Sequence, residues 1–172
     1  DKVDGLRWIR LHYAHPAHLH KDMINSFKDF KKIIPYLDMP VQHGSDRMLK
    51  LMRRGLKSEG IKNKIKSLRE ISPNIAIRTS IIVGFPGEKE EDFNELIDFI
   101  KEVKFDRLGV FTYSDEEGTY AADNLEDNVP DKVKKDRYDT IMMIQQKISL
   151  EKNKKLVGHE DIVVIDKSSK DE

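Results

Sequence analysis

The sequence contains no cysteine, and this absence limits its chemistry more than any other feature of its composition. Without thiols, the 172 residues form no disulfide and supply no thiolate ligand to zinc or to an iron–sulfur cluster. The chain alone is therefore expected to hold no redox centre.

The sequence also lacks a net charge and long apolar runs. Lys and Arg together number 31, as do Asp and Glu, so the formal net charge is zero and any contact with nucleic acid must be local. The apolar runs are far shorter than a membrane span, and the first residues, DKVDGLRWIR, do not resemble a signal peptide. These features favour a cytoplasmic protein with no membrane partner.

Apolar and polar segments alternate in the rhythm of a β/α protein. The expected strands are Leu6–Tyr13, Pro35–Val41, Ile75–Val83 and Asp106–Tyr113, and the expected helices are His18–Lys32, Ser45–Arg54, Glu59–Ile71 and Glu90–Val103. Short connections between these segments predict an α/β fold with a parallel sheet. Four units are too few for a closed eight-stranded barrel, but they suit half of one or an open sheet.

The pattern changes after Tyr113. An acidic loop leads to Pro130, which opens a long helix to about Lys155 with an apolar stripe at Ile141, Ile144 and Ile148. A further strand is expected at Asp161–Asp166, as the opening of a truncated second domain. We therefore expect three parts: 1–129, the β/α units; 130–157, the long helix and linker; and 158–172, the start of a β domain.

The most informative segment is TSIIVGFPGEKEEDF, from Thr79 to Phe93. An apolar strand runs into Gly84-Phe85-Pro86-Gly87, and an acidic helix start follows at Glu88. In parallel sheets and barrels, loops at this end of a strand bind ligands. The residues alone leave open whether the glycines serve a ligand or only make a tight turn.

Three segments together resemble the radical S-adenosylmethionine domain of methylthiotransferases. They are YLDMPVQHGSDRMLKLMRRG (Tyr36–Gly55), RTSIIVGFPGEKEEDF (Arg78–Phe93) and GVFTYSDEEGT (Gly109–Thr119). A fourth segment, QQKISLEKNKKLVG (Gln145–Gly158), resembles the family's linker into its small C-terminal β-barrel, the TRAM domain. The resemblance implies a partial (β/α)6 TIM-like barrel, of which this chain would contain the last four units.

The resemblance also implies cofactors and a substrate. The family uses S-adenosylmethionine and two 4Fe-4S clusters, so the parent enzyme would hold clusters whose cysteine ligands are absent from this chain. The QH pair and the DEEGT loop resemble the RimO-type branch, which methylthiolates the β-carbon of an aspartate in ribosomal protein twelve of the small subunit. Two alternatives are a tRNA-modifying, MiaB-type methylthiotransferase and a non-catalytic half-barrel binding module. With no cluster ligand, the fragment itself is expected to be inactive.

Matching motif positions imply a set of residues that contact S-adenosylmethionine. The set is Gln42 and His43 after the second strand, Arg54, Ser80, Gly84, Phe85, and Phe111 in the fourth strand. Arg53 is an equally plausible cation beside Arg54, and Val110 is an alternative to Phe111. The position of Ser80 carries Asp in some relatives. No catalytic residue and no metal ligand is expected within the chain.

Two clusters leave alternatives open. His12, His15, His18 and His20 are of a metal-ligating type, but their spacing fits no single helix face, so a polar loop rim is the competing interpretation. Asp115, Glu116 and Glu117 are either a solvated loop or a contact for a basic protein substrate.

Overall fold

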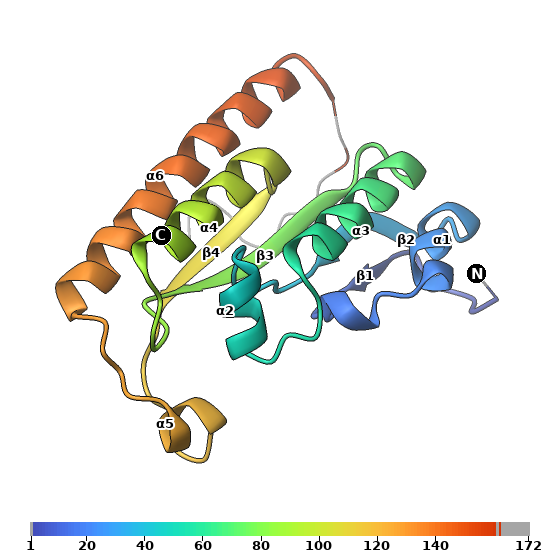
Figure 1. Cartoon of the computed structure of the whole chain (residues 1–172). Coiled ribbons are helices and arrows are strands. Elements are labelled where there is room, and N and C mark those ends of the chain that lie inside the picture. The colour runs from blue at the N-terminus through green and yellow to red at the C-terminus, as the bar shows by residue number, and fades with distance from the viewer. Residues whose placement is uncertain (1, 161, 163–172) are drawn as a thin grey trace, which may run out of the picture.

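Four parallel strands form one sheet in the order β1-β2-β3-β4 in the computed structural model, which describes residues 2–160 and 162. The strands are β1 Ile9–Leu11, β2 Ile33–Asp38, β3 Ala76–Val83 and β4 Arg107–Thr112. The helices are η1 Pro16–His18, α1 Lys21–Asp29, α2 Asp46–Leu51, α3 Ser58–Ile71, α4 Glu90–Val103, α5 Tyr120–Asn124 and α6 Asp131–Leu156 (Figure 1). The predicted α/β fold with a parallel sheet is confirmed.

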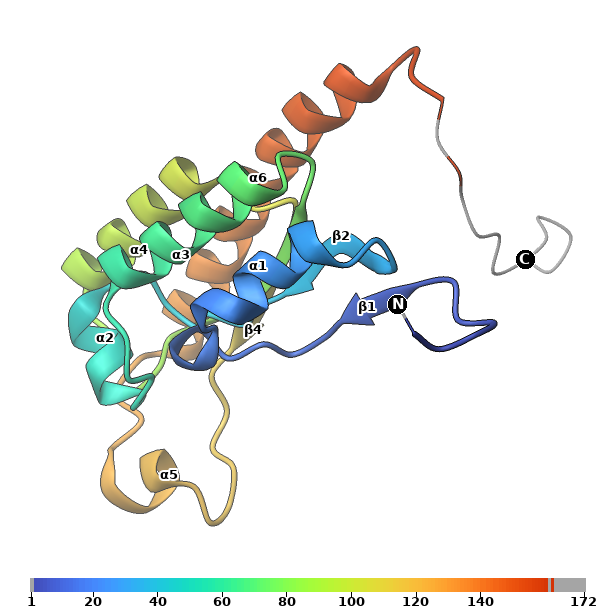
Figure 2. The ribbon, with the colours of Figure 1, turned by 90° about the vertical axis from the view of Figure 1, so that its right-hand side faces the viewer.

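The sheet has a helix-covered face and a more open face. In β3, Ile77, Thr79, Ile81 and Val83 are buried, and the residues that alternate with them are half-buried. Because side chains alternate across a strand, the buried set faces the helices and Ser80 and Ile82 face the other side. Figure 2 shows α1, α3, α4 and α6 gathered on the same side of the strands. The continuous apolar run at 81–83 is typical of a strand that is buried on both faces. The described residues, however, cover only one face of this strand fully.

Helix α4 follows directly from its local sequence. Phe93, Leu96 and Ile100 recur on one face and are buried, while Asp92 accepts a hydrogen bond from the backbone nitrogen of Lys89 at 2.9 Å and so caps the first turn. The helix ends where Lys104 adopts a left-handed conformation with φ 51°. Its bounds are the predicted ones.

Helix α6 runs for 26 residues and packs across β4 and α4. Ile141 and Ile148 are buried as the stripe predicts, and between them Gln145 is buried as well, with its Nε2 donating to the carbonyl of Phe105 at 3.0 Å. Apart from Ile162, the strand expected at Asp161–Asp166 lies outside the described residues, as does most of the expected domain 158–172. Within the described ranges, no helix has both the length and the apolarity needed to cross a membrane.

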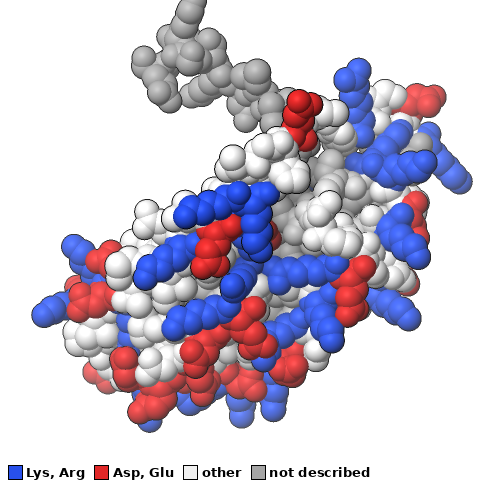
Figure 3. Space-filling view, turned by 90° about the horizontal axis from the view of Figure 1, so that it is seen from above, with Lys and Arg blue, Asp and Glu red and all other residues white. Residues whose placement is uncertain are grey.

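The surface at the upper end of Figure 1 carries both signs of charge. Basic residues occupy the last turns of three helices here, including Arg69 of α3, Lys101 of α4 and Lys155 of α6, where they complement the helix dipoles. Figure 3 shows Asp and Glu side chains between the Lys and Arg side chains on this face. The face is a mixed ionic surface.

Candidate functional site

Strained backbone conformations occur beyond the C-terminal ends of β1 and β2. Tyr13 and Gln42 have positive φ angles of 59° and 75°, although neither is glycine; the other two non-glycine residues with positive φ in the described part of the chain, Arg53 and Lys104, follow helix ends. Such conformations are uncommon for residues with a side chain, and they cluster at ligand-binding sites. The edge of the sheet that the sequence indicated therefore carries an independent mark of a functional site.

A cavity of about 490 Å³ opens at this edge. Four of the predicted cofactor contacts line it: Gln42, Ser80, Phe85 and Phe111. Its other lining residues were not predicted as cofactor contacts, although Glu116 was considered as a substrate contact; they are Tyr13, Pro40, Ile82, Thr112, Tyr113, Ser114, Glu116, Thr119 and Ala121. Apolar rings and a few polar groups thus share one concave site, which is the usual composition of a small-molecule pocket.

Gln42 is held by its backbone and has an unused side-chain acceptor. Its backbone nitrogen donates to the carbonyl of Ser80 at 3.0 Å, and its carbonyl accepts from the nitrogen of Ile82 at 2.9 Å. Its Oε1 is buried and has no hydrogen-bond partner among the described residues. A buried acceptor without a partner is costly, so a ligand that donates a hydrogen bond to Oε1 would be favoured.

Arg54 lies behind the cavity and does not line it. Its Nη2 donates to the carbonyl of Pro40 at 2.8 Å, and its Nε is buried without a partner in the described part of the chain. Burial lowers the pKa of Arg54. Arg53 points elsewhere, with its guanidinium carbon 3.3 Å from the centroid of the Tyr120 ring in α5.

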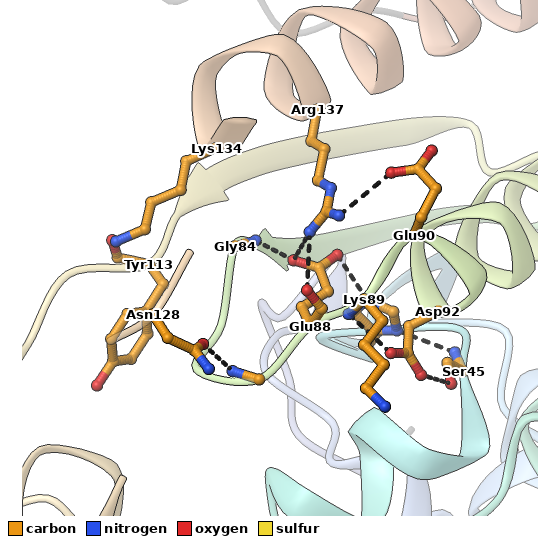
Figure 4. Close-up of polar contacts among 12 residues, drawn as sticks. Ser45, Gly84, Glu88, Lys89, Glu90, Asp92, Tyr113, Asn128, Lys134 and Arg137 are labelled. Carbon is orange, nitrogen blue, oxygen red and sulfur yellow. Dashed lines mark hydrogen bonds and ion pairs between the residues drawn. The ribbon is translucent and has the colours of Figure 1, made fainter. Parts of the chain in front are cut away.

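His43 and Gly84 also lie off the cavity lining. The His43 ring is fully buried, with Nε2 3.2 Å from Oε1 of Glu88. Gly84 has φ 72° and donates its backbone N–H to Oε2 of Glu88 (Figure 4). Both residues therefore serve the turn that precedes α4, and the next residue, Phe85, reaches the cavity.

Tyr113, which directly follows β4, forms part of the cavity wall. Its ring packs edge-on against Phe85 with centroids 5.0 Å apart, and its hydroxyl donates to Oδ1 of Asp115 at 2.6 Å. Burial and the Asp115 carboxylate raise the pKa of Tyr113 to about 12, so the hydroxyl remains a donor at neutral pH. The loop that carries Asp115 and Thr119 thereby closes one side of the cavity.

The histidines near the N-terminus form no metal centre in the described residues. The rings of His15 and His18 have centroids 5.0 Å apart, and burial, followed by Arg54 and His18, lowers the pKa of His15. Among the described residues no group of three or more His, Cys, Asp or Glu is arranged to hold a metal ion.

Comparison with known proteins places this chain in a family. The model of the "Radical SAM superfamily" matches residues 2–100. A ribosomal protein uS12 methylthiotransferase, RimO, of Clostridioides difficile is 49% identical over 170 residues, which are 99% of this chain and 38% of the relative. Another, from Bacteroides thetaiotaomicron, is 46% identical over 166 residues, which are 96% of this chain and 38% of the relative.

A solved structure supports the fold. The radical SAM enzyme coproporphyrinogen III oxidase (HemN) of Escherichia coli matches with a TM-score of 0.67 and 21% identity, over 80% of this chain and 32% of that one. The present chain thus spans about two fifths of the length of the two methylthiotransferases and a third of the structural neighbour.

Proposed function

We propose, from the premise that this chain belongs to the radical SAM superfamily, that it is part of a methylthiotransferase that modifies ribosomal protein uS12. The observation that carries the proposal is the identity of 46–49% to uS12 methylthiotransferases over nearly the whole chain. The QH pair at Gln42 and His43 and the DEEGT loop support the same branch over the tRNA-modifying one.

The cavity suits S-adenosylmethionine by the chemistry of its lining. Phe85, Ile82 and Phe111 offer apolar surface to an adenine ring, and the free Oε1 of Gln42 offers an acceptor to a hydroxyl or amino group. Ser80 supplies a further hydroxyl at the same edge. When bound beside a reduced cluster whose ligands lie outside this chain, S-adenosylmethionine would supply one-electron chemistry at an unactivated carbon. The residues of this chain bind and orient it.

The chain does not fit the iron–sulfur clusters of the family. It has no cysteine, so the ligands of both clusters belong outside this sequence. We therefore assign no electron-transfer step to these residues and expect the chain alone to be inactive.

The finer domain organisation follows from the same proposal. Residues 1–129 would form the last four units of a partial (β/α)6 barrel, 130–157 the long helix and linker, and 158–172 the first strand of a TRAM-like β-barrel. The four parallel β/α units and the 26-residue α6 support the first two parts.

The substrate would approach across the rim formed by residues 113–131. This segment carries seven Asp and Glu residues and neither Lys nor Arg, and its Glu116 lines the cavity. Ribosomal proteins are rich in Lys and Arg, so the negative potential of this rim would favour their encounter with the site.

Analysis of a strain that lacks the gene tests the proposed function. We expect mass spectrometry of its ribosomes to show uS12 without the methylthio group, with the modification restored by the intact gene. A tRNA nucleoside that loses its methylthio group instead would assign the tRNA-modifying branch. If uS12 and tRNA were both unchanged, a non-catalytic module would be the better interpretation.

Replacing Gln42 tests the cofactor site directly. We expect Gln42→Ala to weaken the binding of S-adenosylmethionine by about five- to tenfold, because one buried hydrogen bond is worth roughly 1 to 1.4 kcal/mol. An NMR titration of the ¹⁵N-labelled chain measures this even if binding is weak. Gln146→Ala, the same change at an exposed position of α6, is the matched control. Equal affinities of the two variants would remove Gln42 from the site.

A further inference from the structure

Glu88 is a fully buried carboxylate that joins three separate parts of the chain. Its Oε1 lies 3.2 Å from Nε2 of His43, which follows β2, and its Oε2 lies 3.2 Å from Nη1 of Arg137 in α6. The same Oε2 accepts the backbone N–H of Gly84, at the end of β3 (Figure 4). The side chains of Glu88 and His43 are both 0% exposed, and that of Arg137 is 7% exposed.

The orientation of His43 is fixed by a second hydrogen bond. Its Nδ1 accepts from the backbone nitrogen of Ser45 at 2.9 Å. Nδ1 is therefore the unprotonated nitrogen, and Nε2 carries the hydrogen that is donated to Glu88. Both oxygens of the carboxylate are thus engaged by donors from different elements.

Arg137 connects this carboxylate to the long helix by a fork of contacts. Besides the side chain of Glu88, its Nη1 reaches the Glu88 carbonyl at 3.3 Å, and its Nη2 reaches Oε2 of Glu90 at 3.3 Å. The guanidinium carbon also lies 5.2 Å from the centroid of the Phe93 ring. A planar, multidentate cation of this kind fixes direction as well as charge.

The cluster lies next to the cavity but contributes none of its lining. Gly84 is held by Glu88 through its amide, and the following residue, Phe85, is the ring that lines the cavity and packs against Tyr113. A buried carboxylate is tolerated only while its partners remain in place, so the cluster favours a single arrangement of this turn.

We propose that Glu88, held between His43 and Arg137, is a positioning residue that fixes the Gly84–Phe85 turn and thereby the aromatic wall of the cofactor cavity. Through the contacts of Arg137 with Glu88, this wall is also anchored to α6, although α6 contributes no residue to the cavity lining. The identity of the ligand in this inference rests on the proposed function. The restraint on the Gly84 amide does not depend on that function.

The test compares Glu88→Gln with Glu90→Gln in the 172-residue chain. Both variants remove a carboxylate that contacts Arg137, but the Glu90 side chain is 70% exposed, so its loss is the matched control. We expect Glu88→Gln to speed hydrogen exchange of the Gly84 amide and to weaken S-adenosylmethionine binding, each by about tenfold or more, because hydrogen bonds to charged groups are the stronger ones. NMR reads both quantities, and Glu90→Gln is expected to change neither.

The two measurements, Gly84 amide exchange and S-adenosylmethionine affinity, distinguish a failure of this inference from a failure of the proposed function. If the unmodified chain fails to bind S-adenosylmethionine, the cofactor assignment is wrong, while Gly84 exchange still tests the restraint. Unchanged Gly84 exchange and unchanged affinity in folded Glu88→Gln would overturn the inference. If Glu88→Gln fails to fold, Arg137→Lys is the second variant to test. It keeps the positive charge but loses the several contacts that the guanidinium makes with Glu88 and Glu90. It is expected to weaken binding severalfold, and unchanged affinity would again overturn the proposal.

Discussion

Replacing Gly84 with alanine is expected to lower the free energy of unfolding by about 3 kcal/mol. At φ 72° an added Cβ is strained by about 1 kcal/mol or more. The new Cβ would also overlap Cγ of Lys134 and stand 3.0 Å from its Cδ. Lys134 has no room to retreat, because the residue is only 5% exposed and its Nζ binds Asp127 and the carbonyl of Tyr113. Urea-induced unfolding measures the loss.

Gly118 provides the matched control for this substitution. Its φ of 77° is nearly the same, but an added Cβ there would meet no atom within 4 Å. We therefore expect Gly118→Ala to cost only the backbone strain, about 1 kcal/mol. The difference between the losses in free energy of unfolding of the two variants measures the cost of the overlap with Lys134. Equal losses would show that Lys134 and α6 shift to make room for the added methyl group.

The fold was most predictable where its causes are local. Helix α4 has its predicted bounds, Glu90–Val103, because the apolar spacing, the Asp92 cap and the left-handed Lys104 all lie within or beside it. The helix expected over 18–32 is instead the short turn η1 followed by α1 at Lys21–Asp29. Helix α5 was not predicted at all, since five residues are too short to show a helical period.

The site was predictable to the extent that parallel strands end at one edge of a sheet. The resemblance to the family implied Gln42, Ser80, Phe85 and Phe111, which belong to three successive strands or the residues after them, and the structure brings them to one cavity, although their role as cofactor contacts stays a prediction. The partnership of Glu88 with Arg137 was not accessible from the sequence. The two residues are 49 positions apart, and their pairing depends on how α6 crosses the sheet.

The turn before α4 also makes stability depend on pH through Asp92. Burial alone would raise the pKa of this carboxyl, but hydrogen bonds from Arg47, the Lys89 backbone and Ser45 outweigh it and lower the pKa to about 2. Because the folded value lies below the unfolded value of 3.8, the stabilisation is complete above that pH and is lost as the pH falls towards 2. Its size is about 2 kcal/mol, given that Arg47 is half exposed to solvent.

Asp92→Asn is therefore expected to lose about 2 kcal/mol at pH 7 and to converge with the unmodified chain as the pH approaches 2. Urea unfolding at a series of pH values between 2 and 7 measures both effects. Asp98→Asn, an exposed change on the same helix, should shift stability by less than about 0.5 kcal/mol throughout. A constant gap between Asp92→Asn and the unmodified chain down to pH 2 would show that the lost hydrogen-bond geometry, and not the charge of Asp92, stabilises the turn. In that case the carboxyl group would cap α4 better than an amide even when it is protonated, and its charge pairing with Arg47 would contribute little.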